Sequence, residues 1–232
     1  MKNIVIIGGS SGIGLELVRL FELNNWNVIS TYFSNPVSNR KFVRYIHYSA
    51  LDGLLETKYF PECIDGFVYC PGIINLKQFH RTTSEQFLED YKIQVLGAIE
   101  TLRILLPRLN KSDQSSVVLF SSIAASRGFK YHSLVSSSKG AIEGLAKSLS
   151  AEFAPRIRVN VIAPSITDTP LAKNFLNSEI KRDFHKKLNP LNKFASTSDI
   201  SKLAYYLSSE SSSFITGQTF HVDGGISTII KQ

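Results

Sequence analysis

The chain has 232 residues, 43% of them hydrophobic and 19% charged, and its formal net charge is +7. This composition is ordinary for one globular domain and excludes a disordered chain. There is no run of roughly 18 apolar residues typical of a membrane helix, no signal-peptide pattern and no cysteine spacing typical of a metal site. We therefore expect a cytoplasmic protein with reduced thiols and without a metal.

The positive charge suits an anionic ligand. Because the basic residues are spread along the chain and aromatic residues do not alternate with the one dense run, nucleic acid is not an expected partner. A membrane is not an expected partner either, because no apolar run is long enough.

In chain order, short β-branched apolar runs alternate with longer helical patterns. The strand-like runs are Ile4–Ile7, Asn27–Thr31, Phe42–His47, Gly66–Cys70, Ser116–Phe120, Arg158–Ile162 and Thr219–Val222. The helical patterns cover approximately 12–24, 84–106, 134–154 and 197–209. This alternation predicts an α/β fold, a doubly wound parallel sheet of about seven strands with helices on both faces. We expect one domain over 1–232, in which the strandless segment 168–193 forms a lid over a ligand.

The first strand runs into a glycine-rich turn and the start of a helix. Gly8 permits the turn, Gly12 lets the backbone approach a pyrophosphate, and Gly14 lets the helix pack against the sheet. The phosphates would bind the N–H groups and the positive dipole end of the helix. The context favours a dinucleotide site of the Rossmann type over a plain tight turn. The remaining residues expected to line this site are Ser10, Ser11 and Ile13.

The end of the second strand bears on which dinucleotide binds. An acidic side chain there would bind the ribose 2′-OH and repel a 2′-phosphate. The sequence has Tyr32 at this place without a neighbouring Asp or Glu, and Arg40 and Lys41 follow a few residues later. We therefore expect NADP(H) to be favoured over NAD(H).

Further motifs follow in a fixed order along the chain. Phe120-Ser121-Ser122 ends a strand, Ser138-Lys139-Gly140-Ala141 lies in a long helix, and Val222-Asp223-Gly224-Gly225 lies near the C-terminus. Together with the Gly-x-x-x-Gly-Ile-Gly turn, these motifs resemble the short-chain dehydrogenase/reductases over essentially the whole chain. The resemblance implies hydride transfer with a nicotinamide dinucleotide. Enzymes of the family that use NADP often carry a basic residue in the glycine turn, and Ser11 at that place keeps NAD(H) open. The cofactor positions that the resemblance adds are Ser49, Cys70, Gly72, Lys139, Pro164, Thr167 and Thr169.

The resemblance also implies a catalytic set of a Ser, a Tyr, a Lys four residues after the Tyr, and an Asn. The Lys is Lys139, and the Ser is Ser122, with Ser121 as the weaker candidate. Val135 stands at the Tyr position and Gln94 at the Asn position, so half of the set is absent.

Two residues just before the long helix are candidates to replace the tyrosine. His132 lies seven residues before Lys139, about −20° round a helix, and histidine is a competent acid or base at neutral pH. Enoyl reductases of this superfamily place their tyrosine at the same spacing. Tyr131 lies roughly 80° off that face. The alternative for both residues is a loop position that faces the cleft or solvent.

Two main hypotheses on function follow. The first is an NADP(H)-preferring oxidoreductase that acts on a small carbonyl/alcohol pair or an activated alkene with a non-standard proton donor. The second is a catalytically inactive dinucleotide-binding protein, a partner subunit or a redox-state sensor, which the loss of the Tyr and the Asn predicts. Non-redox chemistry, such as dehydration or epimerisation, is a third alternative.

The apolar positions of the two long helical segments predict a homodimer or homotetramer, because they exceed what one sheet face can cover. Those positions are Leu96, Ile99, Leu102, Leu105, Ile142, Leu145, Leu149 and Phe153. The basic run over 181–187 is a candidate site for an acidic substrate, and a solvated helix face is the alternative.

Overall fold

The computed structural model describes residues 1–53 and 55–230. Its seven strands form one parallel sheet in the order β3-β2-β1-β4-β5-β6-β7. The strands are β1 (Asn3–Ile7), β2 (Asn27–Tyr32), β3 (Val43–His47), β4 (Gly66–Tyr69), β5 (Ser115–Phe120), β6 (Ile157–Pro164) and β7 (Thr219–Val222). The predicted doubly wound α/β fold is therefore confirmed, and its strand order reverses between β1 and β4.

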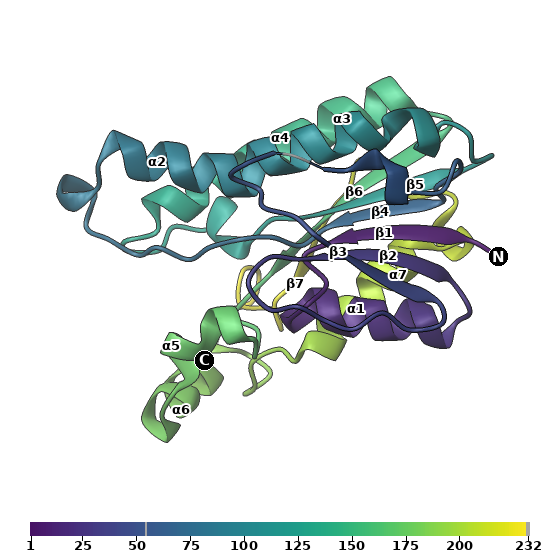
Figure 1. The fold of residues 1–232 in the computed structure, drawn as a ribbon. Coiled ribbons are helices and arrows are strands. Elements are labelled where there is room, and N and C mark those ends of the chain that lie inside the picture. Colours follow the sequence, from purple (N-terminus) through teal and green to yellow (C-terminus); the bar gives the residue numbers. More distant parts are fainter. Residues whose placement is uncertain (54, 231–232) are drawn as a thin grey trace.

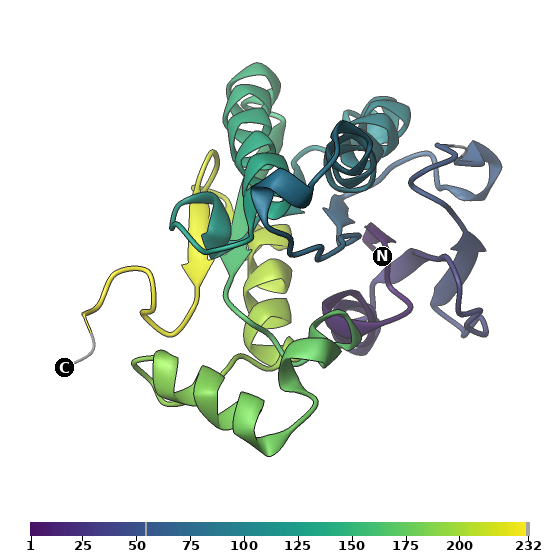
Figure 2. The same cartoon turned by 90° about the vertical axis from the view of Figure 1, so that its left-hand side faces the viewer.

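Helices cover both faces of the sheet (Figures 1 and 2). α1 (Gly12–Leu23) and α7 (Thr197–Ser208) lie on one face, and α3 (Gly97–Leu109) and α4 (Ser133–Phe153) lie on the other. Because both faces are covered, β1 is a continuous apolar run rather than an alternating one. Its Ile4 and Ile6 pack with α1 and α7, whereas Val5 and Ile7 pack with α3 and α4. The short 3₁₀ turns are Thr57–Tyr59, Phe79–Arg81, Ile123–Ala125, Pro170–Ala172 and Glu210–Ser212.

The pattern over 84–106 predicted one helix, but the structure divides it into three parts. α2 (Ser84–Tyr91) is followed by a π-helical turn, Lys92–Leu96, and then by α3. The wider turn buries Gln94, which is 1% exposed. The prediction of a surplus of apolar surface on these helices is wrong at Leu102, Leu105 and Ile142, because all three are buried against the sheet.

The segment over 168–193 contains no strand and forms short helices that project beyond the carboxyl ends of the strands (Figure 1). They are the 3₁₀ turn Pro170–Ala172, α5 (Lys173–Leu176) and α6 (Glu179–Leu188). α6 has no buried residue. Since all strands are parallel, the loops after β1, β4, β5 and β6 meet at this same edge, where ligands of such sheets bind.

Candidate dinucleotide and proton-transfer site

The glycine turn after β1 is tightly packed, and side chains at its key positions would collide with neighbouring atoms. Gly8 and Gly12 have φ angles of 80° and 53°, in the left-handed region that favours glycine. A Cβ on Gly14 would lie 2.2 Å from the Gly8 carbonyl oxygen. The turn is anchored to β2 because the Gly8 N–H donates to Thr31 Oγ1 at 2.8 Å and the Gly9 N–H donates to the Thr31 carbonyl.

The N-terminus of α1 faces this turn without competition from side chains. Its N-cap, Ser11, makes no side-chain capping bond, and the first turn contains no acidic residue. The first N–H groups of a helix lack acceptors within the helix, and the helix dipole favours negative charge there. The arrangement fits a pyrophosphate.

Segments far apart in the sequence meet around the glycine turn, which we call the cradle. A Cβ on Gly12 would lie 3.4 Å from Thr169, a Cβ on Gly8 would lie 3.2 Å from Pro71, and a Cβ on Gly72 would lie 3.8 Å from Lys139 Nζ. The structure therefore brings together the turn, the loop after β4, the segment after β6 and α4. Thr169 Oγ1 donates to the Thr167 carbonyl at 3.2 Å, which holds these two predicted positions against one another.

The remaining predicted cofactor positions lie at the carboxyl ends of their strands. Tyr32 ends β2, and its ring lies 5.5 Å from that of His47 at the end of β3. Ser49 follows β3 and is buried, with its Oγ accepting from the Leu51 N–H. Cys70 directly follows β4, and burial raises the pKa of its thiol to about 12. The others are Ser10, Ser11 and Ile13 in or beside the turn and Pro164 at the end of β6.

Arg40 and Lys41 do not lie at the end of β2, so the expectation that they support a 2′-phosphate site is wrong. Arg40 forms a bridge with Val43, the first residue of β3, at the opposite edge of the sheet. Its guanidinium is paired with Glu22 in the last turn of α1 at 2.7 Å. The chain between β2 and β3 crosses back over the sheet, so nearness in sequence to Tyr32 is not nearness in space.

Lys139 lies inside the protein, where α4 packs against the end of β5. Its Nζ donates to the Phe120 carbonyl at 2.9 Å. Burial lowers the pKa of this lysine to about 8, and the charge of Asp90 acts in the opposite direction.

The hydroxyl of Ser121 already has partners within the protein, because its Oγ donates to Glu143 Oε1 at 2.7 Å and contacts the Lys139 carbonyl at 3.2 Å. Ser122 Oγ accepts only a 3.2 Å bond from the Ala124 N–H, so Ser122 is the better placed of the two.

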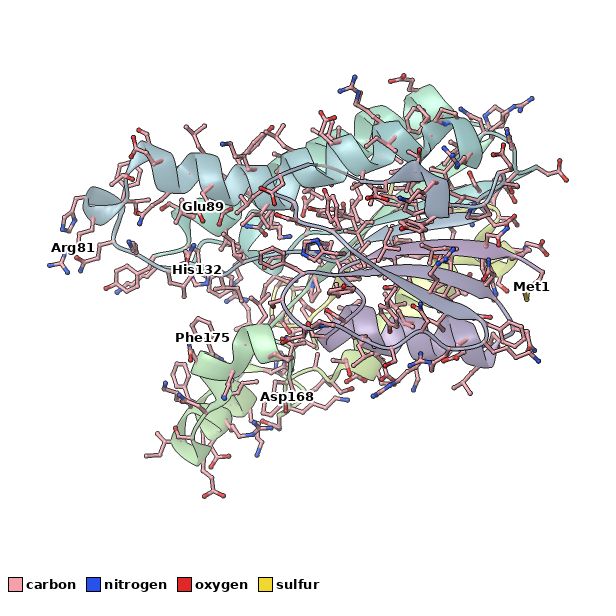
Figure 3. All side chains as sticks on the ribbon, in the orientation of Figure 1. Met1, Arg81, Glu89, His132, Asp168 and Phe175 are labelled. Carbon is pink, nitrogen blue, oxygen red and sulfur yellow. The ribbon has the colours of Figure 1, made fainter. Side chains whose placement is uncertain are left out.

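The two candidate proton donors lie at and just before the start of α4. Val135 is buried one turn before Lys139. His132 is the N-cap residue of α4, at the carboxyl end of the sheet, the end from which the segment with Phe175 projects (Figure 3). Its Nδ1 lies 2.7 Å from the Lys130 carbonyl. A carbonyl can only accept, so Nδ1 carries the hydrogen and Nε2 is the nitrogen available to exchange a proton. Tyr131 lies outside the helix with φ 71° and is 52% exposed.

Tyr131 borders a cavity of about 410 Å³ at this end of the molecule. The loop after β4 forms the other wall and is tied to Tyr131, because the Lys77 N–H donates to the Tyr131 carbonyl at 3.2 Å. The lining residues are Leu76, Lys77, Gln78, Arg81 and Tyr131. Such a space suits a small polar or anionic molecule.

Sequence reasoning missed one member of the site, Asp90. It is 0% exposed, and its Oδ1 accepts from Gln94 Nε2 and from Ser138 Oγ, each at 2.6 Å. The signal was available: Asp90 lies four residues before Gln94, on the same face of the helical segment. An acid at such a position needs a partner inside the protein.

The basic run of α6 is partly neutralised within the projecting segment. Arg182 pairs with Asp168 at 2.6 Å, and Lys186 pairs with Asp183 at 3.2 Å. Lys181 Nζ donates to the Asn174 carbonyl at 2.8 Å. Among the residues that the structure describes, no cluster of His, Cys, Asp and Glu side chains could hold a metal ion, and no helix is long and apolar enough to cross a membrane.

Comparisons with known proteins agree with this geometry. Residues 54–227 match the family model described as enoyl-(acyl carrier protein) reductase. A tropinone reductase homolog from Arabidopsis thaliana is 32% identical over 97% of this chain and 91% of its own length. The crystal structure of a short chain dehydrogenase family protein from Francisella tularensis has a TM-score of 0.88 and 25% identity, and the match covers 99% of this chain and 100% of that one. ElxO with NADP bound has a TM-score of 0.85 and 27% identity, over 97% and 98% of the two chains. The chain belongs to the short-chain dehydrogenase/reductases and is of their oxidoreductase type.

Proposed function

We propose that the chain is a cytoplasmic NADP(H)-preferring oxidoreductase that interconverts a small carbonyl and its alcohol, or reduces an activated alkene. The observation that carries this proposal is the meeting of the glycine cradle, Thr169 and Lys139 at one edge of the sheet. A bound nicotinamide dinucleotide would supply or accept the hydride. The backbone of Gly8–Gly14 and the N-terminus of α1 would hold its pyrophosphate, and Lys139 would hold the nicotinamide ribose.

The proton would come from a group other than the family tyrosine, since Val135 has none to give. His132 is our first candidate, because its Nε2 is free of the Lys130 contact and its spacing from Lys139 is that of the enoyl reductase tyrosine. The match to an enoyl reductase family model supports the same choice. Tyr131 is the second candidate, because it borders the cavity. Ser122 would polarise the substrate oxygen.

The preference for NADP(H) rests on the end of β2. Tyr32 stands where a carboxylate would repel a 2′-phosphate. The binding of NADP by ElxO supports this preference. Arg40 and Lys41 do not contribute to it.

The alternative is an inactive dinucleotide-binding protein that serves as a partner subunit or redox-state sensor. The buried Val135 beside an intact cradle is the specific observation in its favour. NADPH titration followed by fluorescence tests binding for both functions. A screen of ketones, enones and alcohols at 340 nm then separates them: turnover supports the enzyme, and binding without turnover supports the sensor. Failure to bind either dinucleotide would remove both.

We further propose a homodimer or homotetramer that pairs the α2–α3 and α4 surfaces. Leu88, Tyr91 and Leu96 remain 61%, 39% and 39% exposed on the π-helical turn and the helix before it. Burying such side chains between two copies would remove apolar surface from water. Light scattering at micromolar concentration should give a multiple of the 25.9 kDa chain mass, and a monomer would contradict the proposal.

A further inference from the structure

Asp90 is a fully buried carboxylate, and only one of its two oxygens has hydrogen-bond partners. Its Oδ1 accepts two short hydrogen bonds, from Gln94 and from Ser138. Its Oδ2 is buried and has no hydrogen-bond partner among the described residues. Removing a carboxylate from water is costly unless a positive charge or several donors compensate. A compensating cation is therefore expected close by.

Lys139 is the matching half of this pair. An ammonium has three N–H donors, and Lys139 Nζ directs one to the Phe120 carbonyl. On the side of Asp90, Gln94 Oε1 is a second buried acceptor without a donor in the described part of the chain. A Cβ on Gly72 would lie 3.5 Å from Gln94 Oε1 and 3.8 Å from Lys139 Nζ, so these two atoms border the same small space. The space beside Gly72 is therefore bordered by an unmet acceptor, Gln94 Oε1, and by the ammonium of Lys139.

We infer that Asp90 is the internal counter-ion of Lys139, and that Gln94 and Ser138 hold its carboxylate so that the lysine stays charged and positioned at the nicotinamide edge of the site. The donors and acceptors left over are satisfied through water in the space beside Gly72. The pairing is a property of the folded chain, and only its role as a positioning residue in catalysis rests on the proposed function.

Of the other titratable groups near Lys139, only Cys70 also favours the charged lysine, and its effect is smaller than that of Asp90. The thiol of Cys70 is held neutral, since burial raises its pKa to about 12. Glu143, one turn further along α4, accepts from Ser121 instead. Val135 brings no phenol to the site. Asp90 thus opposes the burial that lowers the pKa of Lys139.

The direct test is an NMR titration of protein labelled with [ε-¹³C]lysine, in which the Lys139 signal is identified by its loss in Lys139→Arg. Asp90→Asn keeps the shape of the side chain and removes its charge. We expect the titration midpoint of Lys139 to fall by about one pH unit or more. Ser138→Ala is the matched control, because it removes a hydrogen bond to the same carboxylate but no charge, and its shift should be less than half as large. An unchanged midpoint in folded Asp90→Asn would overturn the inference.

A double-mutant cycle covers the case in which Asp90→Asn does not fold. Lys139→Met alone leaves the carboxylate uncompensated, so adding Asp90→Asn to it should raise the urea midpoint of unfolding. A fall in the midpoint when Asp90→Asn is added to Lys139→Met would overturn the pairing. Coupling in a protein that turns over no carbonyl or alkene would support the pairing and exclude the proposed activity, so the two failures are distinguishable.

Discussion

The two ends of this site are built from different materials. The cofactor end is made of backbone: glycines in a strand-to-helix turn and the N–H groups of α1. The proton-transfer end is made of side chains, each of which must place one particular atom. Exchanging a side chain near the cradle, as at Cys70 or Ser49, leaves backbone donors where they are. Val135 at the position of the family tyrosine lacks the reacting group itself. Dinucleotide binding can therefore outlast the original chemistry in this fold.

The largest effect should follow from adding one methyl group to the cradle. In Gly14→Ala the new Cβ would lie 2.2 Å from the Gly8 carbonyl oxygen, so α1 must move away from the turn. We expect a loss of stability of several kcal/mol, or failure to fold, and loss of NADPH binding. Urea unfolding and fluorescence titration measure both. Gly128→Ala is the control, because a Cβ there meets nothing within 4 Å and should change neither. Normal NADPH affinity in Gly14→Ala would show that the cradle is not the binding element.

The proton-transfer end should show the cost of burying a charged side chain. The pKa of Lys139 is about 8 in the folded protein and 10.5 when exposed, so between these values the unfolded chain binds more protons. The free energy of unfolding should therefore rise with pH from about 8 to 9, by up to about 1.4 kcal/mol per pH unit. Above pH 9 the buried thiol of Cys70, whose pKa is raised from 9.0 to about 12, acts in the opposite direction and flattens the rise. Below pH 8 both states are protonated and the slope vanishes. Lys139→Met should abolish the rise, whereas Lys147→Met, an exposed lysine of the same helix, should keep it. Equal pH profiles in all three proteins would contradict the burial of Lys139.

These two regions also differ in how far the sequence could predict them. The cradle was predicted residue by residue, because glycine spacing after an apolar strand leaves little freedom in the backbone. Lys139 and Ser122 were located by resemblance, but the partner of Lys139 was not. Asp90 lies 49 positions away in sequence, on α2, and only the packing of α2 against α4 brings the two elements together.

The wrong predictions concern residues whose position in space depends on the path of the chain. Arg40 follows Tyr32 by eight positions but lies at the opposite edge of the sheet, because the connection recrosses it before β3. The π-helical turn at Lys92–Leu96 shifts the register of the helix, so apolar positions such as Leu102 and Leu105 face the core. Hydrophobic periodicity cannot reveal an inserted residue in a helix.

The identity of the proton donor can be tested by removing each candidate separately. If His132 supplies the proton, His132→Ala should lower kcat roughly 10²-fold while the affinity for NADPH stays the same. Tyr131→Phe should then change kcat little. The reverse result would assign the role to Tyr131. Equal, small losses in both variants would mean that solvent delivers the proton.

Restoring the family residue is the complementary experiment. Val135→Tyr places a phenol one turn before Lys139, whose ammonium would lower the pKa of that phenol. A gain of carbonyl reduction by Val135→Tyr, where the wild type shows none, would show that the site lacks only its acid, which favours the inactive, cofactor-binding function of the wild type. Loss of an existing activity would show instead that Val135 forms part of the substrate pocket.

The smallest effect concerns the choice of dinucleotide at the cofactor end. Tyr32→Asp puts a carboxylate where the ribose 2′ substituent would lie, so it should weaken NADPH binding about tenfold and strengthen NADH binding. Arg40→Ala is the control that the structure provides: this arginine is paired with Glu22 at the other edge of the sheet, and its removal should leave both affinities unchanged. Titrations of the three proteins with both dinucleotides measure these affinities.

If Arg40→Ala selectively lowered the affinity for NADPH, the connection between β2 and β3 would have to lie nearer the site than it does here. If the wild type bound NADH tenfold more tightly than NADPH, the absence of an acid beside Tyr32 would carry no weight. The choice of dinucleotide would then depend on a side chain other than Tyr32. Dependence on particular side chains would no longer separate the proton-transfer end from the cofactor end.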